Sequence, residues 1–334
     1  DKLKLSTQWV KKGKNNLSTG AKELDRLRED HPIIDLITNY REYTKLLNTY
    51  IDALPKLVDP NSRVHTSFNL TIAQTGRLSS TDPNLQNIPI KTEIGREIRS
   101  AFVSKKDYSL ISADYSQFEL RLAAYLSRDK ELINQFNAGA DIHTMVAAQI
   151  SGLKPEAVTK EMRRFAKTIN FGILYGMSPH GLSVATNMTQ IESKKFIDRY
   201  YELRKPLIGY MNKLLVDAKK NGFVEDLFGR RRPTPDINSG NFIIRKAAER
   251  AAINMPIQGT AADLMKLSMI AVDQKLSIYD AKILIQVHDS ILVECLDKQV
   301  DKVKNLIKTT MEGVYPIDVK LQVDVAVSKN WGNL

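Results

Sequence analysis

Cysteine is nearly absent: Cys295 is the single cysteine among 334 residues. One cysteine excludes a disulfide framework within the chain and favours a reducing compartment. No cysteines and histidines stand at zinc-binding spacing, so a zinc centre is not expected. No apolar run approaches the ~18 residues that a membrane span needs, so no membrane association is expected. The first residues, DKLKLSTQWVKKGK, also lack the apolar core of a signal peptide.

An initiator methionine is missing too, so we expect the chain to be a fragment or a processed product of a longer protein. Acidic residues are outnumbered: 49 lysines and arginines face 38 aspartates and glutamates. The net charge of +11 favours a polyanionic partner. The hydrophobic content of 43% is enough for a globular protein with more than one lobe.

The stretch 163–176 reads RRFAKTINFGILYG and predicts one helix with an unusual face. Positions four residues apart drift only about 40° per step around a helix, so they line one stripe. The stripe has two cations followed by two aromatic rings, which suit a polyphosphate and a stacked base. Taken alone, the pattern favours the alternative of an amphipathic helix with a basic solvated side. The stripe consists of Arg163, Lys167, Phe171 and Tyr175.

Two aspartates each stand where an apolar strand is expected to end. Residues 110–113 predict a short strand before Asp114, and residues 281–287 and 291–295 predict a hairpin with Asp289 at its tip. Carboxylates at two strand ends are what a site for two hard metal ions needs. Aspartate is also a common helix-cap and turn residue. Without a second carboxylate nearby, we would interpret Asp114 as a cap or turn residue and not as a metal ligand.

Two further segments carry polar groups suited to gripping nucleic acid. Residues 74–89 predict an irregular loop rich in hydrogen-bond donors, with Arg77 as its forked cation. Later, three polar residues recur four apart around Pro256, which we expect to kink a helix rather than end it. Each segment alone fits an ordinary surface at least as well. The three polar residues are Arg250, Asn254 and Gln258.

Two patterns in the first part of the chain predict regular elements. Residues 34–54 predict a long amphipathic helix, and residues 63–73 alternate as a half-buried strand does. The expected apolar side of the helix comprises Leu36, Ile37, Tyr40, Leu47, Tyr50, Ile51 and Leu54. The expected face of the strand comprises Val64, Thr66, Phe68, Leu70 and Ile72.

Together these motifs resemble family A DNA polymerases of the bacterial repair type. DYSQFELR, RRFAKTINFGILYG and QVHDS follow one another as motifs A, B and C of that family do. TGRLSSTDPNLQNIP and AERAAINMPIQGTAADLMK are similar to its DNA-binding signatures. The resemblance runs from about residue 18 to the C-terminus, and the order and spacing of the strings make it specific. It implies an α+β, right-hand polymerase fold with an antiparallel-sheet palm, helical fingers and a partial helical thumb.

The resemblance also implies where the parts of this fold lie. No proofreading activity is expected, because the exonuclease-like domain of the family has no counterpart in these residues. The implied parts are the distal thumb at 1–62, the first part of the palm with motif A at 63–127, the fingers at 128–253 with the motif B helix at 163–176, and the second part of the palm at 254–334 with the motif C hairpin at 281–295.

The activity that the resemblance implies is template-directed addition of dNTPs to a primer 3′-OH by two-metal-ion nucleotidyl transfer. Asp114, Asp289 and the backbone carbonyl of Tyr115 would hold two Mg²⁺ ions, for which Mn²⁺ is an expected substitute. Lys167 would also protonate the leaving pyrophosphate. The implied dNTP-binding residues are Arg163, Lys167, Phe171, Tyr175, Glu119, Gln117 and His143. The implied DNA-binding residues are Arg77, Asn84, Gln86, Asn87, Arg250, Asn254, Gln258 and His288.

Glu119 matches the steric gate of the family. Hydrogen-bonded to Tyr175, its carboxylate would occupy the space of a ribose 2′-OH, which predicts selection of deoxynucleotides. A phenylalanine at position 171 is the version expected to disfavour dideoxynucleotides.

The expected partners are primed template DNA and dNTPs, and the protein is expected to act as a monomer. The expected location is the bacterial cytoplasm at the nucleoid, with an organelle or a virus-infected cell as alternatives.

Two residues depart from the family pattern. Phe118 stands where motif A usually has isoleucine, and a modest repacking effect is expected. Ser290 replaces the usual glutamate of motif C, so a third acidic contribution is in doubt. We expect catalysis to survive on two aspartates, and Glu294 to lie too far along the strand to substitute.

Two other functions compete with this hypothesis. A single-subunit RNA polymerase shares a palm with two aspartates, but Glu119 and the TGRLSS string argue against it. A DNA-binding protein with a decayed active site is supported only by Ser290. The retained aspartates and the stripe of residues 163–176 argue against decay.

Overall fold

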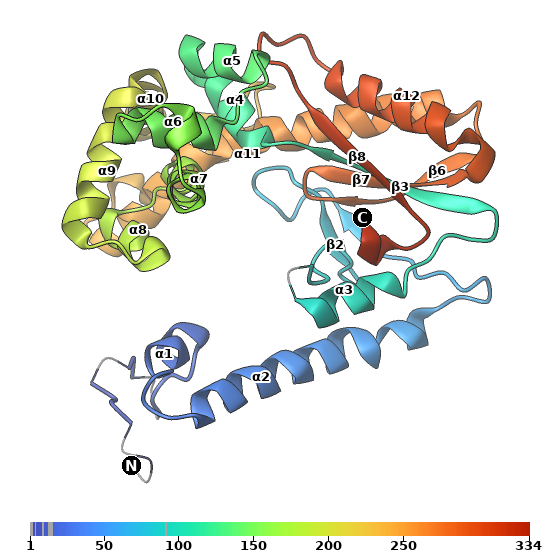
Figure 1. The fold of residues 1–334 in the computed structure, drawn as a ribbon, viewed down its shortest axis with the longest axis horizontal. Coiled ribbons are helices and arrows are strands. Elements are labelled where there is room, and N and C mark those ends of the chain that lie inside the picture. The colour runs from blue at the N-terminus through green and yellow to red at the C-terminus, as the bar shows by residue number, and fades with distance from the viewer. Residues whose placement is uncertain (1–2, 4, 9, 13–15, 91) are drawn as a thin grey trace. The chain divides into compact units, whose positions relative to one another are not determined.

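The computed structural model describes residues 3, 5–8, 10–12, 16–90 and 92–334 (Figure 1). Contacts between residues divide the chain into two compact units. Unit 1 comprises Asp1–Ser67 and Ser80–Phe102, and unit 2 comprises Phe68–Ser79 and Val103–Leu334. Two short strands, β1 (Ser67–Asn69) and β2 (Ser79–Thr81), stand where the chain passes from one unit to the other.

Unit 1 is mainly helical, with α1 (Ala21–Arg26), α2 (Ile33–Leu46) and α3 (Glu93–Ser100). The long helix expected at residues 34–54 is only partly correct, because α2 passes into a π-helical turn at Leu47–Ile51. Its expected apolar side is also only partly correct: Tyr50 and Leu54 are buried, but Leu36 is 62% exposed and Tyr40 70% exposed. The physical reason is that the small core of unit 1 around Leu24, Leu27 and Ile34 covers only one end of α2.

The half-buried strand expected at residues 63–73 is also wrong. Only the three residues of β1 have strand conformation. Leu70 and Ile72, from the expected buried face, are 63% and 61% exposed. Alternation of apolar residues produces a buried face only where a sheet and a covering layer exist, and this segment has only the short two-stranded sheet of β1 and β2.

Unit 2 contains a four-stranded antiparallel sheet in the order β6-β7-β3-β8. The strands are β3 (Tyr108–Tyr115), β6 (Ala281–Val287), β7 (Ser290–Leu296) and β8 (Val323–Ser328). The hairpin of β6 and β7 falls where the sequence predicts it. α11 (Phe242–Leu276) and α12 (Val300–Glu312) pack on this sheet (Figure 1). This arrangement confirms the α+β class.

The other helices of unit 2 gather beside the sheet, from green to yellow in Figure 1. They are α4 (Phe118–Ser127), α5 (Lys130–Asn137), α6 (Ile142–Ser151), α7 (Lys160–Leu174), α8 (Pro179–Thr186), α9 (Gln190–Leu203) and α10 (Lys205–Asn221). A small hairpin of β4 (Phe223–Glu225) and β5 (Arg231–Pro233) precedes α11.

α11 joins the two parts of unit 2. It continues through Pro256 for 35 residues, so the prediction that this proline does not end the helix is confirmed. One apolar core includes Leu120 and Phe136 from the helices, Leu264 from α11 and Val293 from the sheet. The strand ends and α7 are therefore positioned by one continuous core.

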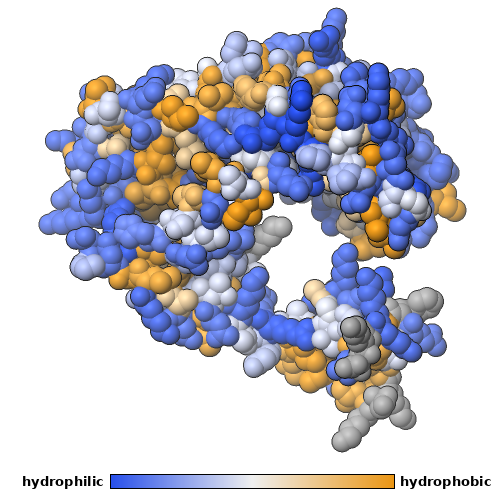
Figure 2. Space-filling model, turned by 180° about the vertical axis from the view of Figure 1, so that it is seen from behind, coloured by the Kyte–Doolittle hydropathy of each residue, from blue (hydrophilic) through white to orange (hydrophobic). Residues whose placement is uncertain are grey.

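Hydrophilic residues cover most of the surface visible in Figure 2, where the hydrophobic residues form separate patches. In the part of the chain that the structure describes, no helix is both long enough and apolar enough to span a membrane.

Candidate active site

The two aspartates lie at neighbouring strand ends. Asp114, the last but one residue of β3, pairs with Ser290 in β7 and with Asp324 in β8. Asp289 lies in the turn between β6 and β7, where its carbonyl accepts a hydrogen bond from the Tyr115 amide at 3.1 Å. Main-chain pairing therefore holds the two acids beside each other, whatever their side chains contact.

Both carboxyl groups resist ionisation. Burial raises the pKa of Asp289 to about 6, the charge of Arg77 opposes the rise, and the charges of Glu119 and Asp114 add to it. Burial, followed by the charge of Asp324, raises the pKa of Asp114. Burial is the main cause of both rises and the neighbouring carboxylates add to it, so a bound cation would stabilise the charged forms of both aspartates.

The two aspartates can contribute oxygen ligands to a hard divalent cation. Mg²⁺ is usually held by one or two carboxylates, with substrate phosphates and water completing its octahedral shell. Among the described residues, no group of three or more histidine, cysteine, aspartate or glutamate side chains is arranged to hold a metal ion. Two aspartates supply only part of a coordination shell, which is how such a cation is held when substrate phosphates and water supply the rest.

Glu119 lies between two hydrogen-bond donors. Arg77 Nη2 is 2.6 Å from Glu119 Oε1 and 3.8 Å from Asp289 Oδ1. The Tyr175 hydroxyl donates to the other oxygen of Glu119. Burial and then the Glu119 carboxylate raise the pKa of Tyr175, so this hydroxyl stays protonated and donates. With only 6% of its side chain exposed, Glu119 is held in one place by both donors.

The stripe predicted at residues 163–176 lies on α7. The helix begins at Lys160, earlier than expected, because the Thr159 side chain caps it by accepting a hydrogen bond from the Met162 amide. It ends at Leu174, and Tyr175 follows at its C-cap. Gly176 then takes a φ of 71°, a conformation that favours glycine and stops the helix.

The two cations of α7 have different surroundings. Arg163 Nε donates to Asp141 Oδ2 at 2.6 Å, and both side chains are partly exposed. Although burial opposes it, the hydrogen bonds from Arg163 and Thr144 lower the pKa of Asp141 to about 2. Lys167 is exposed to solvent. An anionic ligand would therefore compete with Asp141 for Arg163.

His143 lies on α6 against α7. It is 3% exposed, and Asn170 Nδ2 lies 3.0 Å from its Nδ1 atom. Its ring centroid is 5.8 Å from that of Phe171. Burial lowers the pKa of His143 to about 4, Asp141 opposes the fall, and Arg163 and Lys167 add to it. The ring is therefore neutral near pH 7, and donation from Asn170 to Nδ1 places its proton on Nε2.

The expected DNA-binding residues fall in both units. On α11, a Cβ at Gly176 would lie 2.6 Å from Arg250 Cγ, so α11 and the end of α7 are in close contact. Asn254 Oδ1 and Gln117 Oε1 are buried without a hydrogen-bond partner among the described residues. Gln258 lies one turn beyond Asn254, and His288 is exposed beside Asp289 at a φ of 53°.

Asn84, Gln86 and Asn87 belong to unit 1, whereas the other expected site residues belong to unit 2. Gln86 is 8% exposed, and its side-chain oxygen accepts from the Ser80 amide at 3.2 Å. Asn84 accepts from the Gln86 amide at 3.1 Å, and the Asn87 carbonyl accepts from the Tyr50 hydroxyl at 2.8 Å. These bonds brace the loop itself.

The structure gives contacts for Phe118 and Ser290, which depart from the family pattern, and for Glu294. Phe118 is 2% exposed, and its ring stacks on that of Tyr115 at 4.1 Å between centroids. Ser290 Oγ donates to the Val287 carbonyl at 2.9 Å, within the turn. Glu294 pairs with Leu110 and accepts from the Lys105 amide at 3.1 Å, so it is occupied far along β7 from Asp114.

Sequence reasoning missed Asp141, Asn170 and Asp324. Asp141 caps α6 by accepting from the amides of His143 and Thr144, a role that an aspartate just before a helical pattern signals. Asn170 and Asp324 had no such signal, because helix packing and strand register bring them to His143 and Asp114.

The model of DNA polymerase family A matches residues 1–333. The chain is 48% identical over 332 residues to a thermostable DNA polymerase I of Thermus caldophilus, covering 99% of this chain and 40% of that protein. It is 46% identical to DNA polymerase I of Bacillus subtilis, covering 98% of this chain and 38% of that protein. The chain thus spans about two fifths of the length of these relatives.

Among solved structures, the POL domain of Pol1 from M. smegmatis, in complex with DNA primer-template and dNTP, superposes with a TM-score of 0.90. The two share 42% sequence identity, over 97% of this chain and 58% of that one. Its fold, like the α+β architecture found here, is that of a right-hand polymerase. The match of the family model to nearly every residue, together with these identities, shows that the chain belongs to DNA polymerase family A.

Proposed function

We propose that this chain is a template-directed DNA polymerase that adds dNTPs to the 3′-OH of a primer. The observation that carries the proposal is the placement of Asp114 and Asp289 side by side, fixed by the hydrogen bond between Tyr115 and Asp289. The relatives named DNA polymerase I, and the solved relative bound to primer-template and dNTP, support it.

We propose Mg²⁺ as the cofactor, as two ions held by Asp114 and Asp289 with the Tyr115 carbonyl, and Mn²⁺ as a substitute. Bound there, the ions would lower the pKa of the primer 3′-OH and neutralise charge on the triphosphate. The raised pKa values of both aspartates support a site that awaits a cation.

The cations of α7 bind the triphosphate. Arg163 exchanges its bond to Asp141 for phosphate oxygens, and Lys167 adds a second positive charge before donating a proton to the leaving pyrophosphate. His143 is neutral, with its proton on Nε2, so it offers a hydrogen-bond donor rather than a charge to the same phosphates. Phe171 packs on the nucleotide, and Gln117 lies near the sugar.

Glu119 selects the sugar. Its carboxylate, held by Arg77 and Tyr175, leaves no room for a ribose 2′-OH. Arg77, Arg250 and Gln258, with Asn254 and His288 nearby, donate to minor-groove acceptors that every correct base pair presents, so they check pair shape without reading sequence. Asn84, Gln86 and Asn87 contact the DNA backbone from unit 1.

We propose the part boundaries that the family resemblance implies: distal thumb at 1–62, palm at 63–127 and 254–334, and fingers at 128–253. We further propose that the protein acts as a monomer in the bacterial cytoplasm near the nucleoid.

Primer extension tests the function directly. The parent chain, with Mg²⁺ and four dNTPs, should extend a primed template, whereas Asp114→Ala and Asp289→Ala should not. A parent chain that binds primed DNA without extending it would be retested as Ser290→Glu. Recovery would assign the defect to the missing acid, and continued inactivity would overturn the proposal in favour of a DNA-binding protein.

A further inference from the structure

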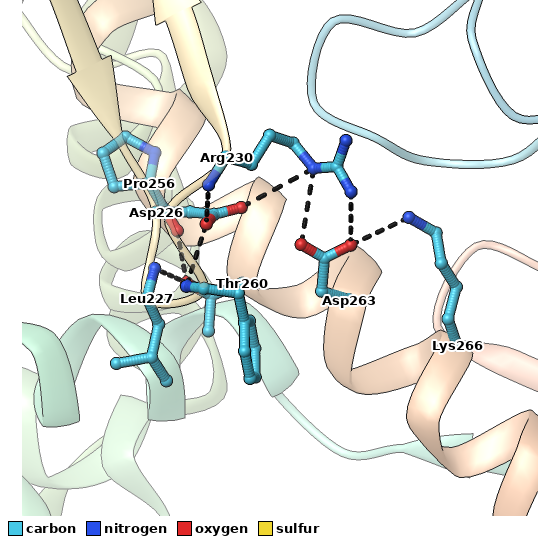
Figure 3. A network of polar contacts seen from close by, with 8 residues as sticks. Asp226, Leu227, Arg230, Pro256, Thr260, Asp263 and Lys266 are labelled. Carbon is cyan, nitrogen blue, oxygen red and sulfur yellow. Dashed lines mark hydrogen bonds and ion pairs between the residues drawn. The ribbon is translucent and has the colours of Figure 1, made fainter.

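The hairpin of β4 and β5 is hydrogen-bonded to α11 close to Pro256 (Figure 3). Asp226 Oδ1 accepts from the amides of Phe228 and Arg230, at 3.0 and 2.9 Å, and so shapes the hairpin loop. Thr260 Oγ1 on α11 accepts from the Leu227 amide at 3.2 Å and donates to the Pro256 carbonyl at 2.7 Å. The loop therefore has a defined position on the helix.

Arg230 extends from this loop to α11. Its Nη2 atom is 2.8 Å from Asp263 Oδ1 and its Nε atom 3.3 Å from Asp263 Oδ2, a bidentate pair (Figure 3). Nε also lies 3.8 Å from Asp226 Oδ2, a buried atom that has no hydrogen bond to any described residue. Lys266 adds a bond to Asp263 at 2.8 Å. The bidentate pair with Asp263 fixes the plane of the guanidinium as well as its position.

The guanidinium lies against Gly76, the residue before Arg77. A Cβ at Gly76 would lie 2.5 Å from Arg230 Nε and 2.7 Å from Cζ, so a larger residue there would displace the Arg230 side chain. The φ of 75° at Gly76 favours glycine for a second, independent reason. The backbone of the Arg77 loop therefore packs against the Arg230 side chain, which Asp263 and Asp226 hold in place.

We propose that Arg230 is a positioning residue for Arg77, and through Arg77 for Glu119. The chain of contacts runs from Asp263 through Arg230 to Gly76, and then through Arg77 to the carboxylate that selects the sugar. Loss of Arg230 lets the loop shift, so Arg77 holds Glu119 less firmly and ribonucleotides enter more readily. This sugar-selecting role rests on the proposed polymerase function.

The test uses three variants of the full chain: Arg230→Met, Asp263→Asn, which keeps the shape of Asp263 but removes its charge, and Arg231→Met as the matched control. Arg231 stands on the same hairpin, where its Nε pairs with Glu225 at 2.7 Å on an exposed surface. The first readout is amide hydrogen exchange of the segment 73–79, which needs no activity. Exchange should quicken in Arg230→Met and Asp263→Asn and stay at the parental rate in Arg231→Met.

The second readout is the ratio of kcat/KM for a ribonucleotide to that for the matching dNTP. We expect this ratio to rise about tenfold in Arg230→Met, the size of one lost hydrogen bond, with a smaller rise in Asp263→Asn. In an Arg77→Met background the Arg230 substitution should add nothing, because the contact it supports is already gone.

Unchanged exchange of the segment 73–79 in both Arg230→Met and Asp263→Asn would overturn the inference, whether or not the chain polymerises. Faster exchange with an unchanged ratio of kcat/KM for ribonucleotide to dNTP would also overturn it. So would effects of Arg230→Met and Arg77→Met on that ratio that multiply in the double variant. Either result would leave the hairpin a purely structural role. A parent chain that does not extend a primer would refute the proposed function alone, because the exchange readout would still decide whether Arg230 holds the loop.

Discussion

The strand ends of unit 2 and helix α7 hold their charged groups in different ways. Asp114 and Asp289 are placed by strand pairing and a main-chain hydrogen bond, and burial raises the pKa values of both. Arg163 is 45% exposed and tied to Asp141 alone in the described contacts, and Lys167 is exposed. The acids are thus fixed before any ligand arrives, whereas the cations can exchange partners. This difference suits a reaction in which the acids must hold one geometry while the triphosphate enters and leaves.

Removal of an acid at the strand ends should have the largest effect. We expect Asp289→Asn to slow nucleotide incorporation by roughly three orders of magnitude, because several kcal/mol of charge stabilisation is lost. Asp324→Asn is the matched control, since Asp324 pairs with Asp114 but is outside the proposed ligands. Single-turnover incorporation measures both. An equal loss in Asp324→Asn would mean that Asp324 belongs to the site.

On α7, Lys167→Ala should slow the chemical step about 100-fold, as expected for loss of a general acid. Arg164→Ala, on the same helix but off the stripe, should leave the rate unchanged. Single-turnover rates at saturating dNTP separate chemistry from binding. A Lys167→Ala rate equal to the parental rate would remove the proton-donor role.

Between the two regions, Glu119→Ala should admit ribonucleotides. The substitution opens the space that the carboxylate fills and also frees Arg77 and Tyr175, so dNTP incorporation should fall while the ribonucleotide ratio rises at least about tenfold. Competition between an rNTP and its dNTP on one template measures the ratio. A ratio equal to that of the parent would show that another group excludes the 2′-OH.

His143 should make stability depend on pH. Its pKa is about 4 in the folded protein, below the usual 6.5, so the unfolded chain binds the proton more tightly. Stability is therefore full above pH 6.5 and falls as the pH drops from 6.5 towards 4, by up to about 3 kcal/mol. His143→Gln should flatten this part of the profile in urea unfolding at several pH values. Equal slopes in parent and variant would contradict the assignment.

The smallest effect should come from Asp141→Asn. Asparagine still caps α6 but no longer competes for Arg163, so the apparent Kd for dNTP should fall by about two- to fivefold. Because the ion pair is partly exposed, the melting temperature should change little. Single-turnover titration with dNTP measures the affinity. Weaker binding would show that Asp141 orients Arg163 instead of competing for it.

Much of the fold and of the site can be predicted from local sequence. The hairpin around Asp289, the strand that ends near Asp114, and the passage of α11 through Pro256 all follow from patterns a few residues long. The stripe of α7 follows from a spacing of four. Such features depend on backbone preferences and hydrophobic periodicity, which neighbouring residues carry.

The same reasoning fails where burial depends on distant segments. The alternation around Leu70 and the apolar stripe around Tyr40 resemble buried faces, yet both residues are exposed because few described residues of their own units cover them. The sequence by itself determined the local elements and indicated most of the residues that we propose for the site. Tertiary structure alone decided that Arg77 reaches Glu119, that Arg230 seats Gly76 and that Asp324 faces Asp114. Those contacts join residues far apart in the chain, so chain topology, strand register and core packing set them, and no local pattern encodes them.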